Sequence, residues 1–217
     1  MTSKNKKIWI GLVILGVLTS FVVVRDGKPD IDTSGIKESA LISYASTYNY
    51  RQTKNDCGPF NVAAVVRALK GENIDSTSFA EEIGWRLPNK YTLPWGLENQ
   101  FQENGISIEK PHFNLLTDDE KIMLIQQYLS TGKPIIILGE RDNYEHYLTI
   151  LGFNAKNDKY YIYDSLQAAS PEQQGMTTDE NGQNPGNATL SSNELLDFWH
   201  GGGMYGLWKW YGLVASL

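Results

Sequence analysis

The chain has 217 residues, a formal net charge of −6 and 41% hydrophobic residues, which predicts one domain with a sizeable buried core. No basic cluster follows the first residues, so nothing suggests a nucleic-acid-binding surface. The single cysteine excludes an intramolecular disulfide and a zinc site built on paired cysteines, and no motif indicates a metal or a cofactor.

Residues 1–25 are expected to direct the chain to a membrane. Lysines precede an apolar run from Ile8 to Val24, and Arg25 ends the run. Its length suits a short spanning helix and exceeds the usual core of a signal peptide. Because no small-x-small cleavage motif ends it, we favour an uncleaved single-pass anchor over a cleaved signal. The lysines should stay in the cytoplasm, which places the following domain on the extracytoplasmic side.

Residues 26–43 are expected to form a linker, because turn formers recur there without an apolar period. The folded domain is expected to occupy residues 44–217, and its first half is predicted to be helical. The predicted helices are 59–69, ended by Gly71; a short helix opened by a capping box at Ser78–Glu81; 94–104, ended by Gly105; and a helix opened by a capping box at Thr117–Glu120 and ended by Gly132.

The second half of the domain is predicted to form strands at 134–138, 146–153 and 159–164. Turn formers at 154–158 predict that the last two strands pair as an antiparallel hairpin. The polar stretch 170–192 is predicted to be a long surface loop, and the aromatic-rich tail from Leu195 a helix followed by a closing strand. Helices followed by strands predict an α+β fold.

Cys57 lies just before the helix predicted from Pro59. Unpaired N–H groups and the positive end of the helix dipole favour a thiolate at such a position, and the thiolate is the nucleophilic form. The backbone N–H of Cys57 can donate to an oxyanion, and Gln52 is available upstream as a second donor. The alternative is a buried thiol without chemistry, which is a common use of a free cysteine.

His146 is the candidate base and Asp164 its orienting carboxylate, because an imidazole needs a partner on its second nitrogen to fix the tautomer. The hairpin register decides whether the two side chains share a face. A turn of three or five residues, or a bulge, puts them on one face, whereas a two-residue turn puts them on opposite faces. The alternative for His146 is an ordinary strand histidine, and the alternative for Asp164 is a turn former at a strand end, both without chemistry. His112 and His200 are then the other candidates for the base.

Two blocks of the sequence resemble the C39 and C39-like cysteine peptidases. One is Gln52 to Pro59 (QTKNDCGP) followed by an Ala/Val-rich helix, and the other is His146 to Phe153 (HYLTILGF) followed by Tyr161 to Ser165 (YIYDS). The resemblance covers roughly residues 44–170. It implies a papain-like fold, in which an N-terminal helical part packs on a C-terminal antiparallel sheet. It also implies hydrolysis of a peptide or related amide bond through a thioester, with Cys57, His146 and Asp164 as the triad and Gln52 as the oxyanion residue.

The sequence departs from the family pattern in two respects. The family's oxyanion glutamine usually lies at the position that Arg51 occupies here, and Gln52 lies one residue nearer to the cysteine. The best-known members precede an exporter and trim double-glycine leaders, and no exporter segments are found here. The expected function is therefore a membrane-anchored cysteine peptidase with an unspecified peptide or protein substrate. The alternatives are a lapsed peptide-binding module of the same fold and an acyltransferase that resolves the thioester with an amine.

Overall fold

The computed structural model describes residues 27–204 and 206–217. The predicted membrane segment, 1–25, lies outside these residues. Within the described ranges, no helix is both long and apolar enough to cross a bilayer.

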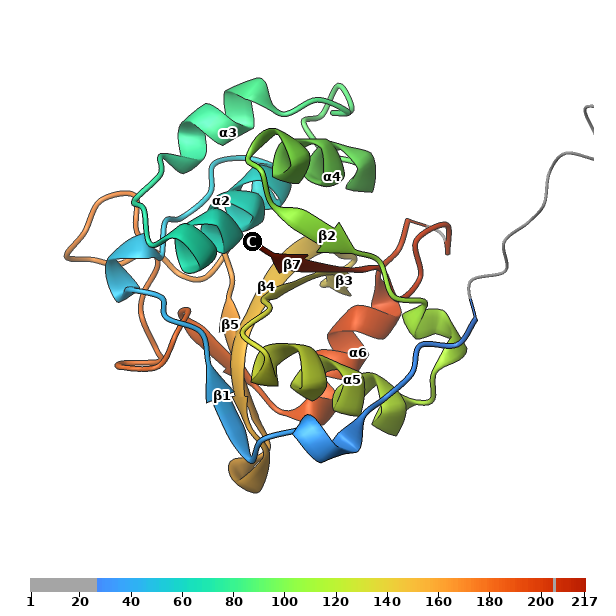
Figure 1. The fold of residues 1–217 in the computed structure, drawn as a ribbon. Coiled ribbons are helices and arrows are strands. Elements are labelled where there is room, and N and C mark those ends of the chain that lie inside the picture. Colours follow the sequence, from blue (N-terminus) through green and yellow to red (C-terminus); the bar gives the residue numbers. More distant parts are fainter. Residues whose placement is uncertain (1–26, 205) are drawn as a thin grey trace, which may run out of the picture.

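The described residues form an α+β fold around one antiparallel sheet of seven strands (Figure 1). The strand order is β2-β7-β3-β4-β5-β6, and β1 pairs with the far end of β4. The strand β7 therefore lies inside the sheet, between β2 and β3. The strands are β1 (Ser39–Leu41), β2 (Ser107–Glu109), β3 (Ile135–Arg141), β4 (Tyr144–Asn154), β5 (Lys159–Tyr163), β6 (Ala188–Leu190) and β7 (Gly212–Ser216).

Helices cover both faces of this sheet (Figure 1). They are α2 (Cys57–Lys70), α3 (Ser76–Glu82), α4 (Pro94–Glu103), α5 (Asp118–Ser130) and α6 (Ser192–Gly201), with short 3-10 helices η1 (Thr33–Gly35), η2 (Ser46–Tyr48), η3 (Phe113–Leu115) and η4 (Ala155–Asn157). Strand β3 shows the two-residue alternation of a strand buried on both faces. Ile135 and Ile137 pack with α5 and α6, whereas Ile136 and Leu138 pack with α2.

The predicted helices are present, with one error in how they begin. Helix α2 ends at Gly71, whose φ of 71° is the left-handed conformation that glycine adopts freely. The capping box predicted at Thr117 is confirmed at the start of α5. The box predicted at Ser78 is wrong, because Asp75 caps α3 through the N–H of Thr77 and Ser78 lies inside the helix.

The sheet contains strands from more segments of the chain than the sequence patterns predicted. Strands β1 and β2 come from the first half, so helices and strands are not strictly separated along the chain. Part of the segment expected to be a linker joins the sheet through β1, and Ile42 beside it is buried. The predicted surface loop 170–192 contains β6, which pairs with β5. The helix and closing strand predicted for the tail are confirmed as α6 and β7.

The hairpin of β4 and β5 forms as predicted, with a register set by a bulge. Asn154 pairs with Lys159 across η4, but Thr149 pairs with Tyr163, and the register shifts by one residue between Ile150 and Gly152. Beyond the bulge, positions 146 and 164 share a face. The sequence had predicted that Asp164 ends the strand. In the structure Asp164 follows Tyr163, the last residue of β5.

Candidate active site

Cys57 is the first residue of α2, and its side chain is buried. The preceding residue, Asp56, makes no capping bond to the helix, because its carboxylate binds Arg86 at 2.6 Å and accepts a hydrogen bond from Thr53. Side-chain caps therefore do not occupy the first N–H groups of α2. Those groups and the positive end of the helix dipole lie beside the thiol.

Asn61, one turn along α2, fixes the helix against β4. Its Nδ2 atom donates to the carbonyl oxygens of Cys57 and Tyr147, both at 2.8 Å. Its Oδ1 atom accepts from the hydroxyl of Thr149 at 2.6 Å. Every polar atom of this buried amide is thus used, and the bonds join the cysteine backbone to the strand that carries His146.

His146 and Asp164 form a buried pair. The Nε2 atom of His146 lies 2.7 Å from Oδ1 of Asp164. The same carboxylate oxygen accepts from the N–H of Leu166 at 2.8 Å, and Oδ2 accepts from Nη1 of Arg141 at 2.8 Å. Asp164 can therefore fix both the tautomer and the orientation of the imidazole.

Asn187, a buried residue that begins an Asn-Ala-Thr sequon but that the sequence analysis did not place in the site, holds the backbone of Asp164. Its Oδ1 accepts from the N–H of Asp164, and its Nδ2 donates to the carbonyl of Asp164, each at 2.8 Å. Arg141 was also missed. Its bond to Asp164 joins the end of β3 to the residue after β5, and no local pattern reveals such a contact.

The two members of the pair shift each other's proton affinity. Burial lowers the pKa of His146, but the hydrogen bond to Asp164 and the nearby Cys57 thiol outweigh it and raise that pKa to about 9. Burial raises the pKa of Asp164, but the bond to His146 and the charge of Arg141 hold it below its ordinary value. An imidazolium paired with a carboxylate is therefore the stable form at neutral pH.

The second nitrogen of the imidazole is left for the cysteine. The Nδ1 atom of His146 is buried and has no hydrogen-bond partner of normal geometry among the described residues. The thiol of Cys57 nonetheless lies close enough to raise the pKa of the ring. Since Nε2 is taken by Asp164, Nδ1 is the atom that can exchange a proton with the thiol.

Gln52 lies on the same cleft as His146, with its amide held in one orientation. The hydroxyl of Ser165 donates to Oε1 of Gln52 at 2.5 Å, and the N–H of Gln52 donates to the carbonyl of Ser165 at 2.9 Å. These bonds leave Nε2 as a donor without a protein partner in the described part of the chain. Arg51, which precedes Gln52, is exposed at the cleft margin.

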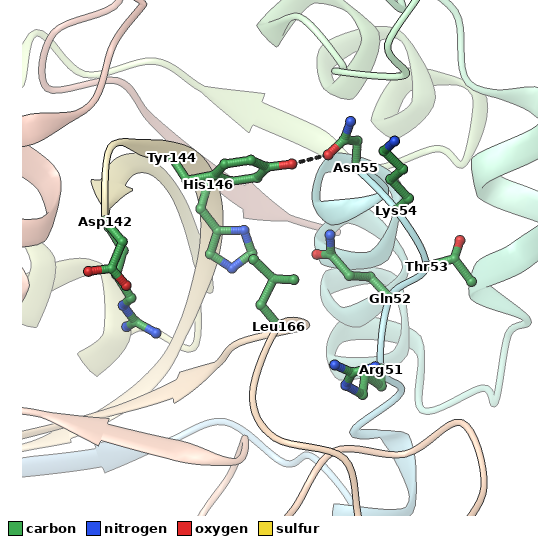
Figure 2. A pocket seen from close by; sticks show the side chains of 10 residues that line it. Arg51, Gln52, Thr53, Lys54, Asn55, Asp142, Tyr144, His146 and Leu166 are labelled. Atoms are coloured by element: carbon green, nitrogen blue, oxygen red, sulfur yellow. Dashed lines mark hydrogen bonds between the residues drawn. The ribbon is translucent and has the colours of Figure 1, made fainter.

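His146, Gln52 and Arg51 line a cleft of about 650 Å³. Figure 2 shows His146, Tyr144 and Asp142 on one wall, the segment 51–55 on the opposite wall, and Leu166 between them. The hydroxyl of Tyr144 crosses the cleft and donates to Oδ1 of Asn55 (Figure 2). Tyr91 packs on Tyr144, with the ring centroids 5.5 Å apart.

The other two histidines lie elsewhere. His112 lines a different hollow beside Trp95, and His200 contacts Trp210 near the end of α6. Among residues 27–204 and 206–217, no group of three or more His, Cys, Asp and Glu side chains could hold a metal ion. The structure therefore brings Cys57, His146 and Asp164 close together, and His146 lines the same cleft as Gln52.

Comparisons with known proteins concern the same region. The model of the Peptidase_C39 like family matches residues 44–184, a span that includes Gln52, Cys57, His146 and Asp164. The search of curated proteins found no match.

Similar solved structures include the peptidase domain of Streptococcus ComA, a bi-functional ABC transporter involved in a quorum-sensing pathway. It is 15% identical with a TM-score of 0.48, covering 78% of this chain and 99% of that one. The Streptococcus mutans ComA peptidase domain bound to a small-molecule inhibitor is 14% identical with a TM-score of 0.42, covering 77% of this chain and 97% of that one.

Proposed function

Because the chain belongs to the Peptidase_C39 like family, we propose that it is a cysteine peptidase of papain-like mechanism that hydrolyses a peptide or related amide bond. The observation that carries the proposal is the meeting of three groups from distant parts of the chain. Cys57 opens a helix, His146 lies on a strand of the sheet and Asp164 follows the next strand. All three side chains are buried, and His146, which binds Asp164 and is influenced by Cys57, lines the cleft.

The first half of the proposed reaction forms a thioester. The thiolate of Cys57 attacks the carbonyl carbon of the scissile bond, and the resulting oxyanion accepts hydrogen bonds from the N–H of Cys57 and from Nε2 of Gln52. When the C–N bond breaks, Nδ1 of His146 gives its proton to the leaving amine. Asp164 keeps its bond to Nε2 throughout and holds the ring in place.

The second half releases the acid. The now neutral Nδ1 of His146 takes a proton from water, and the hydroxide oxygen attacks the thioester carbon. The same two donors stabilise the second oxyanion, and the C–S bond breaks to restore the thiolate and the imidazolium. Both halves need one nitrogen of His146 without another partner, and among the described residues Nδ1 has none, which supports the proposal.

Two measurements test this proposal. Replacement Cys57→Ala should abolish hydrolysis of a peptide library while leaving the circular dichroism spectrum and the melting temperature near those of the wild type. Iodoacetamide should label Cys57 quickly near neutral pH and more slowly after His146→Ala. His200→Ala is the matched control, because it removes a histidine outside the site. Hydrolysis that survives Cys57→Ala would refute the proposal.

We also propose that residues 1–25 anchor the chain in a membrane, with the peptidase domain on the extracytoplasmic side. The support is the apolar run from Ile8 to Val24 and the lysines before it. A protease added to intact cells should digest the domain, whereas deletion of residues 1–25 should leave it inside the cells and protected. Protection of the full chain in intact cells would contradict this orientation.

A further inference from the structure

We propose that the active-site cleft binds a carboxylate of the substrate next to the scissile bond, through Arg51 and Lys54. This inference rests on the proposed peptidase function and specifies its substrate class: peptides that carry Asp, Glu or a free C-terminus beside the bond to be cut.

The cleft is locally basic in an acidic protein. The chain as a whole carries a formal net charge of −6. The residues that line the cleft include three basic side chains, Arg51, Lys54 and Arg141, and one exposed acidic side chain, Asp142. A cleft lined by one sign of charge attracts ligands of the opposite sign, because its low-dielectric walls focus the field.

Two buried carboxylates close to the cleft along the chain, those of Asp56 and Asp164, already have partners. Asp56, two residues after Lys54, binds Arg86 at 2.6 Å and accepts from Thr53. Asp164 binds Arg141 at 2.8 Å and His146 at 2.7 Å. Neither carboxylate is available to neutralise Arg51 or Lys54.

Arg51 and Lys54 themselves have donors to spare. In the described part of the chain neither makes an ion pair, and the guanidinium of Arg51 makes one long hydrogen bond, from Nε to the carbonyl of Gln167 at 3.4 Å. Asp142 lies on the opposite wall of the cleft (Figure 2). An arginine with free donors in a planar fork matches a carboxylate, which can accept two parallel hydrogen bonds.

The two cations flank the proposed oxyanion donor. Arg51 directly precedes Gln52 and Lys54 follows it by two residues, and all three side chains line the same cleft (Figure 2). Leu166, 41% exposed, offers an apolar contact between the walls. A substrate side chain with a short aliphatic stem and an anionic end fits these surroundings, and so does a terminal carboxylate.

The test compares matched peptides on the full chain. One series carries Glu or Gln at each position around the scissile bond, and a second carries a free or an amidated C-terminus, so the two sources of carboxylate are distinguished. One acidic peptide should be hydrolysed with a kcat/KM about tenfold higher than its neutral partner, the scale of one charge-assisted hydrogen bond. The advantage should shrink as salt is raised.

Substitutions test whether Arg51 and Lys54 cause the preference for acidic peptides. Arg51→Gln and Lys54→Gln should each reduce the acidic-to-neutral ratio, mainly by raising KM for the acidic peptide, and the double variant should bring the ratio near one. Lys156→Gln on η4, an exposed lysine that does not line the cleft, is the matched control and should leave the ratio unchanged. A ratio that survives the double variant, or a preference for neutral or basic peptides in the wild type, overturns the inference.

Binding separates this inference from the proposed catalysis. Fluorescence anisotropy with the same labelled peptides is measured on the Cys57→Ala variant, which needs no turnover. Tighter binding of the acidic peptide, lost in Arg51→Gln, supports the carboxylate site even if no peptide is hydrolysed. If peptides are hydrolysed but acidic peptides are preferred neither in binding nor in turnover, the carboxylate site is refuted and the peptidase proposal is unaffected.

Discussion

Nδ2 of Asn61 donates to the carbonyl oxygen of Tyr147 at 2.8 Å, so one buried amide joins α2 to β4 beside His146. The same atom binds the carbonyl of Cys57. The spacing of the thiol and the imidazole therefore depends on a polar contact and not on apolar packing alone, which can slide with little cost in energy.

Asn61→Ala should both destabilise the fold and slow the chemistry. Two buried carbonyls and the hydroxyl of Thr149 lose their partner, at a cost of about 2–4 kcal/mol in the free energy of unfolding. The alkylation rate of Cys57 should fall at temperatures where the variant is still folded. Thr149→Val, which removes only the hydroxyl that orients Asn61, serves as the milder comparison. An alkylation rate equal to the wild type would mean that Asn61 is only structural.

Asp164→Asn should be a milder loss than His146→Ala. The asparagine can still accept a hydrogen bond from Nε2 of His146 and keep the ring oriented, whereas alanine at 146 removes the proton carrier altogether. Steady-state kcat on one peptide compares them. Equal losses would show that the negative charge of Asp164 is itself required.

The activity should fall at high pH. The pKa of His146 rises from its ordinary value of 6.5 to about 9, so the imidazolium that protonates the leaving amine is present at neutral pH and is lost as the pH passes about 9. In a profile of kcat/KM, Asp164→Asn should move this alkaline limb toward lower pH, because the largest interaction that raises the pKa is removed. An unmoved limb would assign it to another group.

The free energy of unfolding should also depend on the protonation of His146. Because the folded pKa of His146 exceeds its unfolded value, the folded state binds this proton more tightly. Its stabilising contribution is fully present below about pH 6.5 and is lost as the pH rises through about 9. Asp164 has a lowered pKa, so its contribution is present above its ordinary value of 3.8 and is lost as the pH falls through the folded value. Melting temperatures of wild type and His146→Gln across this range check the first part.

Ser165→Ala should act through Gln52. Without the donated hydrogen bond to Oε1, the amide of Gln52 can rotate and its Nε2 no longer points reliably at the oxyanion. We expect kcat to fall by about threefold to tenfold with KM nearly unchanged, the scale of one neutral hydrogen bond. Gln52→Ala should cost about 10²–10³ in kcat, as for other oxyanion donors. When Gln52→Ala is already present, Ser165→Ala should not lower kcat further. Additive losses of kcat would contradict the inference that Ser165 acts through Gln52.

Tyr144→Phe should make Cys57 easier to reach. Cys57 is only 2% exposed, and the hydroxyl of Tyr144 ties the hairpin wall to Asn55 just before the helix. Loss of this bond should speed alkylation by about threefold to tenfold, since a single hydrogen bond is removed from the closed form. Tyr128→Phe on α5, a tyrosine that does not line this cleft, is the control. A rate that does not change would mean that the bond is already open most of the time.

The sequence predicted the local parts of this molecule well. Helix α2, the capping box at Thr117 and the hairpin of β4 and β5 follow from spacing and turn residues, which act over a few positions. The failed capping box at Ser78 shows the limit of such patterns. Asp75 competes for the same helix start and wins because its carboxylate reaches the N–H of Thr77.

The sequence patterns did not predict the contacts between segments that lie far apart along the chain. The register of His146 and Asp164 depends on a bulge between Ile150 and Gly152. A strand glycine such as Gly152 is compatible with a bulge but does not require one. Asn187 lies in a stretch predicted to be a surface loop, yet it holds the backbone of Asp164. Such partners are chosen by tertiary packing, so their residue types alone do not reveal them.

The central position of β7 affects when the domain can mature during synthesis. The edges of β2 and β3 that pair with β7 stay unpaired until residues 212–216 have emerged from the ribosome. An open chain is what a secretion channel can thread. If the domain is exported as proposed, its sheet cannot be completed until residues 212–216 have passed through the channel.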